Sequence, residues 1–277
     1  SAFRFSRGRA LRMSGRIDDE GDGTLARAPV AAAPLGRREA AVEGAFHIPV
    51  LLGLFGDTPG EGPFAEPTIQ DAYFGSGTGT ITAYYDEVSR GMVELDGDVR
   101  GWFRAAPEHT RDWVTDGSSG LGHGGRVATF IRDLLEETSG IDWALYDNDG
   151  PDGIPDSGDD DGYVDALAVI HPTAGGECGG PGSEDRIWSH RWSLSAPAGG
   201  SAYTTAVPSI NGGFIRVDDY LIQPAYSCGS GLNEIGVFTH ELGHAFGLPD
   251  LYDTSGDDAQ HQGVGTWGLM ATGSWGC

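Results

Sequence analysis

His240, Glu241 and His244 form the pattern H-E-x-x-H, which has the residue types of a metal-dependent hydrolase. Two histidines four residues apart on a helix project from the same face, so both imidazoles can bind one metal ion. Glu241 follows the first histidine, where a carboxylate can take a proton from a water molecule that the metal activates. The pattern therefore predicts zinc-dependent hydrolysis, and the favoured reaction is cleavage of peptide bonds.

The flanking sequence predicts that the helix carrying this pattern is buried. An H-E-x-x-H pattern can also arise by chance on a solvated helix, where it would have no function. Here apolar residues recur at helical spacing and form a continuous stripe: Ile235, Phe238, Leu242 and Ala245. Because unpartnered polar groups are costly in a buried helix, the two histidines and the glutamate need a ligand.

Asp250 is the favoured third metal ligand. Gly247 can adopt the left-handed conformation that ends a helix, and Pro249 prevents its continuation. The chain is therefore expected to turn and return Asp250 toward the metal. Two histidines and one carboxylate would leave a fourth coordination position for water, as a catalytic zinc site requires.

The residues after Glu241 limit the alternatives for this third ligand. No glutamate follows Glu241, so a glutamate ligand from a second helix is excluded within this chain. His261 is the main alternative, because histidine is the more usual zinc ligand, although it lies in a polar segment and can equally be solvated. Three further candidates remain: Asp253, Asp257 and Asp258.

A second candidate metal site lies in the acidic segment 147–165. Aspartates that alternate with glycines present carboxylates and carbonyls to a hard cation, and they repel one another when no cation is bound. The segment is not an EF-hand, because the pattern lacks the helices and the terminal glutamate. A disordered acidic linker is the alternative. We expect structural calcium, as one ion or two, held by six aspartates: Asp147, Asp149, Asp152, Asp159, Asp161 and Asp165.

Several segments resemble the immune-inhibitor-A-type family of secreted bacterial zinc metallopeptidases. The most specific are H-E-L-G-H-A-F-G-L-P-D-L-Y-D at 240–253 and G-V-G-T-W-G-L-M-A-T-G-S-W at 263–275. Residues 84–91 and 161–171 support the resemblance, which covers roughly residues 45–277.

The resemblance implies a metzincin-like fold, a secreted enzyme made with a propeptide as a zymogen, and bound calcium. Position by position, it assigns zinc-ligand roles to His240, His244 and Asp250, and the role of general base to Glu241. Met270 matches the methionine turn of such peptidases. Its side chain is expected to pack beneath the histidines and to take no part in the chemistry.

These residues must be positioned by an α/β (α+β) domain with a mixed twisted sheet and an active-site helix. Apolar runs and alternation predict strands at residues 46–55, 163–171, 186–192 and 214–220. Helical periodicity predicts helices at residues 80–89 and 126–138. Residues 92–95 and 99–103 are predicted to form a hairpin, because Asp96-Gly97 between them is a strong turn signal.

Residues 1–41 are expected to be a propeptide remnant or a disordered linker, with the catalytic domain at 42–277. The first part is rich in arginine, whereas the acidic excess behind the net charge of −24 lies downstream. An acidic body argues against nucleic acid and anionic membranes as partners. No apolar run is long enough to span a membrane. A secretory signal is expected upstream and a further C-terminal part downstream, because the sequence ends seven residues after Met270.

The chain has three cysteines, and an extracellular protein is expected to pair two of them. The bridge Cys178–Cys228 is favoured, because both residues lie in glycine-rich segments that flank the region before the metal helix. Cys277 would then be unpaired or bonded to a missing C-terminal part. His171 and His190 are expected to be structural or to line the cleft.

Two other functions compete with a secreted zinc endopeptidase. One is a calcium-stabilised, non-catalytic surface or adhesion module that keeps a relic metal site. A relic would be free to lose Glu241, so the intact pattern favours the peptidase. The other, weaker alternative is a zinc hydrolase that acts on bonds other than peptide bonds.

Overall fold

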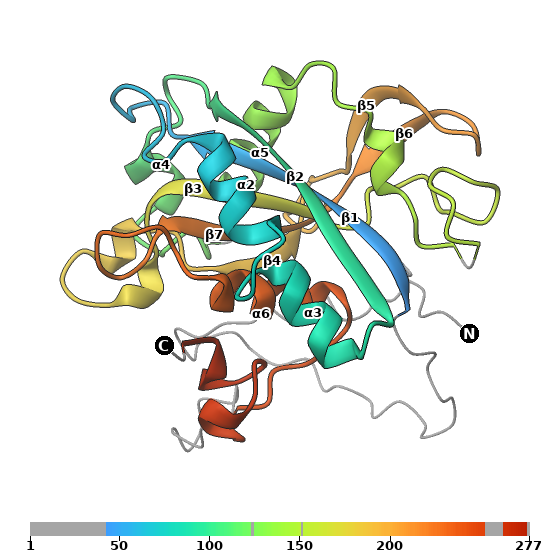
Figure 1. The fold of residues 1–277 in the computed structure, drawn as a ribbon. Helices are drawn as coiled ribbons and strands as arrows, with labels where there is room; N and C mark the ends of the chain where they lie inside the picture. Colours follow the sequence, from blue (N-terminus) through green and yellow to red (C-terminus); the bar gives the residue numbers. More distant parts are fainter. Residues whose placement is uncertain (1–42, 123–124, 151, 253–262, 276–277) are drawn as a thin grey trace, which may run out of the picture.

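The computed structural model describes residues 43–122, 125–150, 152–252 and 263–275. Its centre is a five-stranded sheet in the order β2-β1-β3-β7-β4 (Figure 1). The first four strands are parallel, and β4 pairs antiparallel with β7 at one edge. The strands are β1 (Gly44–Leu54), β2 (Val93–Arg104), β3 (Leu167–Ala174), β4 (His190–Ser193) and β7 (Asp219–Tyr226). A separate ribbon pairs β5 (Tyr203–Pro208) with β6 (Phe214–Val217).

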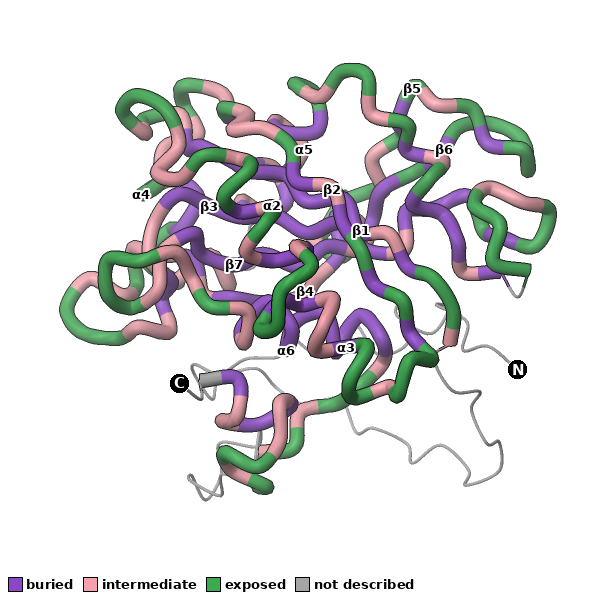
Figure 2. The backbone as a smooth tube through the Cα atoms, viewed as in Figure 1, coloured by how far each residue is buried: buried purple, intermediate pink, exposed green. Residues whose placement is uncertain are grey.

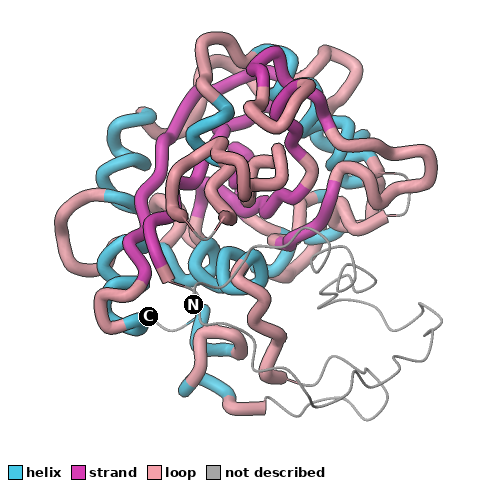
Figure 3. The backbone as a smooth tube through the Cα atoms, turned by 90° about the vertical axis from the view of Figure 1, so that its right-hand side faces the viewer, coloured by secondary structure: helices cyan, strands magenta, loops and turns pink. Residues whose placement is uncertain are grey.

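Helices surround the twisted strands (Figures 1 and 3). The α-helices of the described residues are α2 (Glu66–Phe74), α3 (Ile81–Ser89), α4 (Arg111–Thr115), α5 (Arg126–Glu137) and α6 (Ile235–Ala245). Short 3-10 turns are η1 (Trp143–Tyr146), η2 (Gly176–Cys178), η3 (Ser183–Asp185), η4 (Gly265–Trp267) and η5 (Thr272–Trp275). None of the helices in these described ranges is long and apolar enough to cross a membrane.

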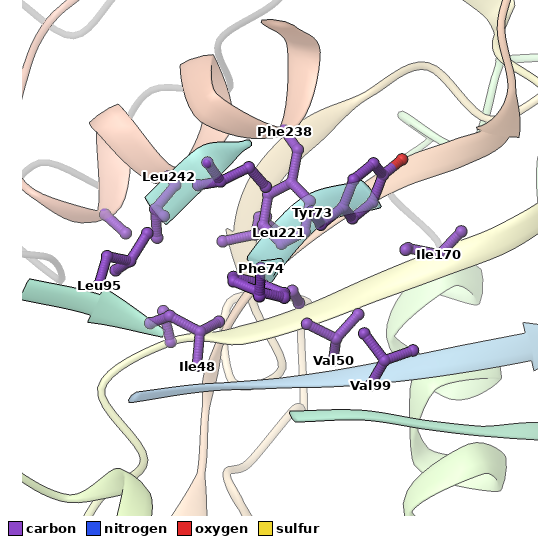
Figure 4. Packing of buried hydrophobic residues seen from close by; sticks show 14 of the residues in the cluster. Ile48, Val50, Tyr73, Phe74, Leu95, Val99, Ile170, Leu221, Phe238 and Leu242 are labelled. Atoms are coloured by element: carbon purple, nitrogen blue, oxygen red, sulfur yellow. The ribbon is translucent and has the colours of Figure 1, made fainter. Parts of the chain in front are cut away.

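Two hydrophobic cores lie on opposite faces of the sheet, because successive side chains of a strand point to opposite sides. In β1, Val50 and Leu52 belong to one core and Leu51 to the other. The first core is shared with α2, α3 and α6, whose aromatic side chains pack above the strands (Figure 4). The second core is shared with α5 and η1. The central strands β3 and β7 are buried along most of their length (Figure 2).

The predicted hairpin at residues 92–103 is wrong. Asp96 and Gly97 lie inside the single strand β2, which pairs in parallel with β1 on both sides of one shift in register between Leu52 and Gly53. Gly97 is needed for packing, since a β-carbon there would come within 2.5 Å of the Phe74 ring. Tertiary pairing with β1 and close contact with α2 therefore override the local turn signal.

Side chains of α2 hydrogen-bond to the outer edge of β2. The Gln70 amide donates to the carbonyl of Gly97 at 2.8 Å and accepts from the backbone N–H of Val99 at 2.8 Å. The carboxylate of Glu66 accepts from the N–H of Gly101 at 3.0 Å. These bonds occupy edge groups that would otherwise be open to pairing with another strand.

The other element predictions are confirmed in type, with shifted bounds. The segment predicted at 46–55 is β1, and those at 80–89 and 126–138 are α3 and α5. Regular pairing in the strand predicted at 163–171 begins only at Leu167, and that at 186–192 shortens to β4. The strand predicted at 214–220 is divided into β6 and β7 at Asp218, which is buried and accepts two hydrogen bonds from Ser195. Residues 1–41 lie outside the described residues.

Candidate metal centre

Helix α6 carries the H-E-x-x-H pattern in a buried position. Every residue from Val237 to Ala245 is buried, and Phe238 and Leu242 belong to the hydrophobic core that α6 shares with α2 and α3. Gly247 has φ +84, and the N–H of Leu248 donates to the carbonyl of Gly243 at 3.0 Å, as in glycine-terminated helices. The chain reverses there, which returns Asp250 to the face that carries both histidines.

His240, His244 and Asp250 present three ligand atoms to one point. The Nε2 atoms of the two histidines are 3.1 Å apart, and Oδ1 of Asp250 lies 3.3 Å from the first and 3.4 Å from the second. Ligands at about 2.0–2.1 Å from a tetrahedral zinc ion lie about 3.3 Å from one another. The three atoms therefore have the spacing of one face of a zinc tetrahedron.

Two backbone carbonyls fix the tautomers of the histidines. Nδ1 of His240 lies 2.8 Å from the carbonyl of Leu269, and Nδ1 of His244 lies 2.8 Å from the carbonyl of Leu248. Since a carbonyl only accepts, each Nδ1 carries a hydrogen, and in the neutral imidazole each Nε2 then has a lone pair. Two lone pairs that face each other at 3.1 Å repel unless a cation lies between them. The donor set thus fits a metal ion.

The charges at the centre also suit a cation. Burial alone would raise the pKa of Asp250, but the two histidines beside it hold that pKa below 3.8, so the group is an anion. Burial lowers the pKa of His240, while Asp250, Glu241 and the carbonyl of Leu269 raise it more, to a value above 6.5. Glu241 itself is 5% exposed and lies on the same buried stretch of α6.

Met270 packs directly beneath the metal helix. It is buried, and a β-carbon added to Gly243 would lie 2.6 Å from its sulfur. Gly243 stands between Glu241 and His244, so the sulfur touches α6 at the centre of the pattern. Any side chain at position 243 would push the two segments apart.

Comparison with known proteins identifies the family to which this chain belongs. The profile described as "Immune inhibitor A peptidase M6, catalytic domain" matches residues 64–277. The chain belongs to the immune inhibitor A peptidase M6 family. As an M6 peptidase it is a metallopeptidase, and the family implies a bound metal, typically zinc. The family predicted from the sequence is confirmed.

Two relatives show how much of a longer protein this M6 domain represents. Immune inhibitor A of Bacillus thuringiensis subsp. alesti is 33% identical over 227 residues, which are 78% of this chain and 31% of that protein. Pre-pro-metalloprotease PrtV of Vibrio cholerae serotype O1 (strain M66-2) is 29% identical over 207 residues, which are 71% of this chain and 21% of that protein. The chain therefore matches about a third or less of each relative.

The acidic segment of the M6 domain brings three of the six predicted calcium ligands together. Asp147, Asp149 and Asp165 each offer a carboxylate oxygen within 4.8 Å of the others. Burial and the neighbouring aspartates raise the pKa of Asp147 to about 7, and they raise that of Asp165 well above 3.8. Oδ1 of Asp147 is buried without a hydrogen-bond partner. These features fit a hard cation bound by carboxylates.

The other three predicted calcium ligands are not in this group. Asp152 accepts from the N–H of Ile154 at 2.8 Å, and Asp159 accepts from the N–H of Asp152 at 3.2 Å. Asp161 accepts from the N–H of Tyr163 at 3.0 Å. These hydrogen bonds help to hold the shape of the loop, and a calcium-binding role for the three residues stays a prediction.

The other residues predicted from the sequence either lie away from the metal centre or fall outside the described residues. His171 and His190 lie with Tyr220 on the sheet face opposite α6, so they are structural and do not line the metal site. His261 lies outside the described residues, as do Asp253, Asp257, Asp258 and Cys277. Cys178 and Cys228 form the predicted disulfide, which joins the segments after β3 and β7.

Sequence reasoning missed the groups that hold the metal helix in place. The carbonyls of Leu248 and Leu269 carry no signal in residue type, because every residue has one. The hydroxyls of Tyr73 and Tyr85 reach the chain at Asn233 and Thr239, which are far away in sequence. These contacts can be identified only from the three-dimensional structure.

Proposed function

We propose that this chain is the catalytic domain of a secreted zinc endopeptidase in which His240, His244 and Asp250 bind the zinc ion. The observation that carries the proposal is the triangle of ligand atoms, in which both Nε2 atoms and Oδ1 of Asp250 lie within hydrogen-bonding distance of one another. When bound, zinc supplies a Lewis acid that activates water and polarises the scissile carbonyl.

Glu241 acts as the general base. Its carboxylate takes the proton from the attacking water and then passes it to the leaving amine, which a buried carboxylate beside the reacting atoms can do. The carbonyls of Leu269 and Leu248 keep the ring hydrogens on Nδ1 and so hold the Nε2 lone pairs toward the metal.

The substrate is a protein or peptide that binds in extended form along β4. Among the described residues, β4 pairs with β7 on one side only, and it lies next to α6. The opposite edge of the sheet, at β2, is already hydrogen-bonded by Gln70 and Glu66. A peptide backbone can therefore add as a strand at β4 and cross the metal centre.

Calcium has a structural role at Asp147, Asp149 and Asp165. Burial first, and then repulsion by neighbouring carboxylates, raises the pKa of Asp147, and a divalent cation there would offset both. The other acidic residues of the loop hold its backbone, so one ion at this group suffices for the observed arrangement.

Secretion is supported by the disulfide Cys178–Cys228, since such bonds persist in oxidising compartments. The name of the PrtV relative, a pre-pro-metalloprotease, describes a protein made with segments that are removed, and we propose the same for residues 1–41. The non-catalytic module is not favoured, because the three candidate metal ligands lie together and the chain retains Glu241.

Zinc content and casein cleavage of the purified chain test this proposal together. We expect about one zinc ion per chain. Cleavage should be lost after treatment with a zinc chelator and restored by added zinc. Cleavage that persists in the metal-free protein would contradict the mechanism. A zinc-loaded protein that cleaves no peptide bond would support the non-catalytic module.

A further inference from the structure

Tyr85 of α3 contacts the metal helix on both sides of the H-E-x-x-H pattern. Its hydroxyl donates to the backbone carbonyl of Thr239 at 2.8 Å, and both groups are buried. Its ring packs edge-on against Phe246, with centroids 5.0 Å apart and an interplanar angle of 74°. Thr239 immediately precedes His240, and Phe246 follows the last residue of α6.

The hydrogen bond of Tyr85 is made to a carbonyl that the helix already uses. In an α-helix the carbonyl of residue 239 accepts from the N–H of residue 243, so Tyr85 adds a second donor at this position. Residue 243 is the glycine that rests on the sulfur of Met270. The helix thus contacts the Tyr85 hydroxyl at Thr239 and Met270 at Gly243, on either side of His240 in the sequence.

The Tyr85 hydroxyl is a hydrogen-bond donor at neutral pH. Burial raises the pKa of its hydroxyl well above 10.0, and neighbouring Tyr84 adds to the rise. The hydroxyl therefore keeps its hydrogen and remains a donor.

We propose that Tyr85 is a positioning residue of the metal centre, whose hydroxyl sets the orientation of His240 through the carbonyl of Thr239. This inference rests on the proposed zinc-binding role of His240. Tyr85 does not touch the metal or the substrate. It acts on the placement of the Nε2 lone pair, as partners behind a metal ligand do in other metal sites.

Tyr73 of α2 provides a matched control in the same hydrophobic core. Its hydroxyl donates to the carbonyl of Asn233 at 3.1 Å, and its ring packs edge-on against Phe238 at 5.4 Å. Asn233 lies before the start of α6 and is not adjacent to any predicted metal ligand. Removing this hydroxyl loses one part-buried hydrogen bond to the segment before α6 without acting on His240.

The test compares Tyr85→Phe with Tyr73→Phe, because both substitutions keep the ring. Zinc dissociation constants are measured by competition with a chelating dye, and kcat and KM are measured with a peptide substrate. We expect Tyr85→Phe to weaken zinc binding about five- to tenfold and to lower kcat by a similar factor, with KM unchanged. Tyr73→Phe should lower thermal stability about as much as Tyr85→Phe does. It should leave zinc affinity and kcat at wild-type values.

Two results would overturn the role of Tyr85. One is a zinc affinity and kcat for Tyr85→Phe equal to those of the wild type. The other is an equal change in both variants, which would indicate general loosening of α6. Failure of the proposed function looks different, since the wild-type chain itself would then bind no zinc or show no chelator-sensitive cleavage.

Discussion

Acidification should destabilise the fold through two histidines that have no part in the chemistry. His171 and His190 are 0% and 3% exposed. Burial lowers the pKa of His171 to about 3, helped by the charge that nearby His190 would carry, and burial lowers that of His190 to about 4. Both rings are therefore neutral in the folded protein, and the perturbation of interest is a fall in pH to about 5.

The size of the effect follows from the two protonation states. Between its folded pKa and the ordinary value of 6.5, each histidine binds a proton only when the chain is unfolded. Stability is therefore complete above about pH 6.5 and is lost as the pH falls below it. At about pH 5 the folded rings of His171 and His190 are still neutral. Each histidine therefore lowers the free energy of unfolding by about 2 kcal/mol relative to neutral pH, and the two together lower it by about 4 kcal/mol.

Urea unfolding at about pH 7.5 and about pH 5 measures this loss. The variants His171→Asn and His190→Asn keep a polar group at each site and cannot take up a proton in this range. Each should be less stable at neutral pH, but its loss of stability on acidification should be about 2 kcal/mol smaller than that of the wild type. The metal site titrates equally in all three proteins and cancels in the comparison.

The reasoning is refuted if both variants lose as much stability on acidification as the wild type. That result would mean that the buried imidazoles are protonated in the folded state. It would also move the cause of any acid sensitivity to the carboxylates.

Three further predictions concern the metal sites and the disulfide. Asp165→Asn should raise the melting temperature measured without calcium, because it removes a crowded buried carboxylate. The wild type should gain about 3 kcal/mol of stability when calcium is present at a hundredfold excess over its dissociation constant, and the variant should lose this gain. Equal stabilisation of both proteins by calcium would exclude this site. Asp250→Ala should weaken zinc binding more than about 100-fold in a chelator competition, and an unchanged affinity would assign the third ligand elsewhere. Replacing Cys178 and Cys228 by serine, which opens a loop with a sequence separation of 50, should lower the free energy of unfolding by up to about 4 kcal/mol in urea, and no loss would show that the bond is dispensable.

The sequence predicts the clustering of His240, His244 and Asp250 because these residues are close together in the chain. Helical spacing sets His240 and His244 on one face, and the turn at Gly247 limits where Asp250 can lie. The structure brings these three together in the predicted arrangement, and it places Met270 against the same helix. Local rules are sufficient here because the geometry is local.

Features that depend on distant contacts could not be predicted in the same way. Asp96-Gly97 does not form the predicted turn, because β2 pairs in parallel with β1 through these residues. The local sequence does not encode this pairing. In the acidic loop, the grouping of Asp147, Asp149 and Asp165 depends on how the loop folds, which the spacing of the aspartates does not determine. The bond from Tyr85 to Thr239 spans 154 residues and has no local signature.

The most direct test of the central claim is casein cleavage by Glu241→Gln beside the wild type, with the zinc content of both proteins measured. Glutamine keeps the shape of the side chain but cannot accept the proton from water. We expect the variant to retain about one zinc ion per chain and to lose at least about 100-fold in kcat. A zinc-loaded Glu241→Gln variant that cleaves casein at the wild-type rate would contradict it.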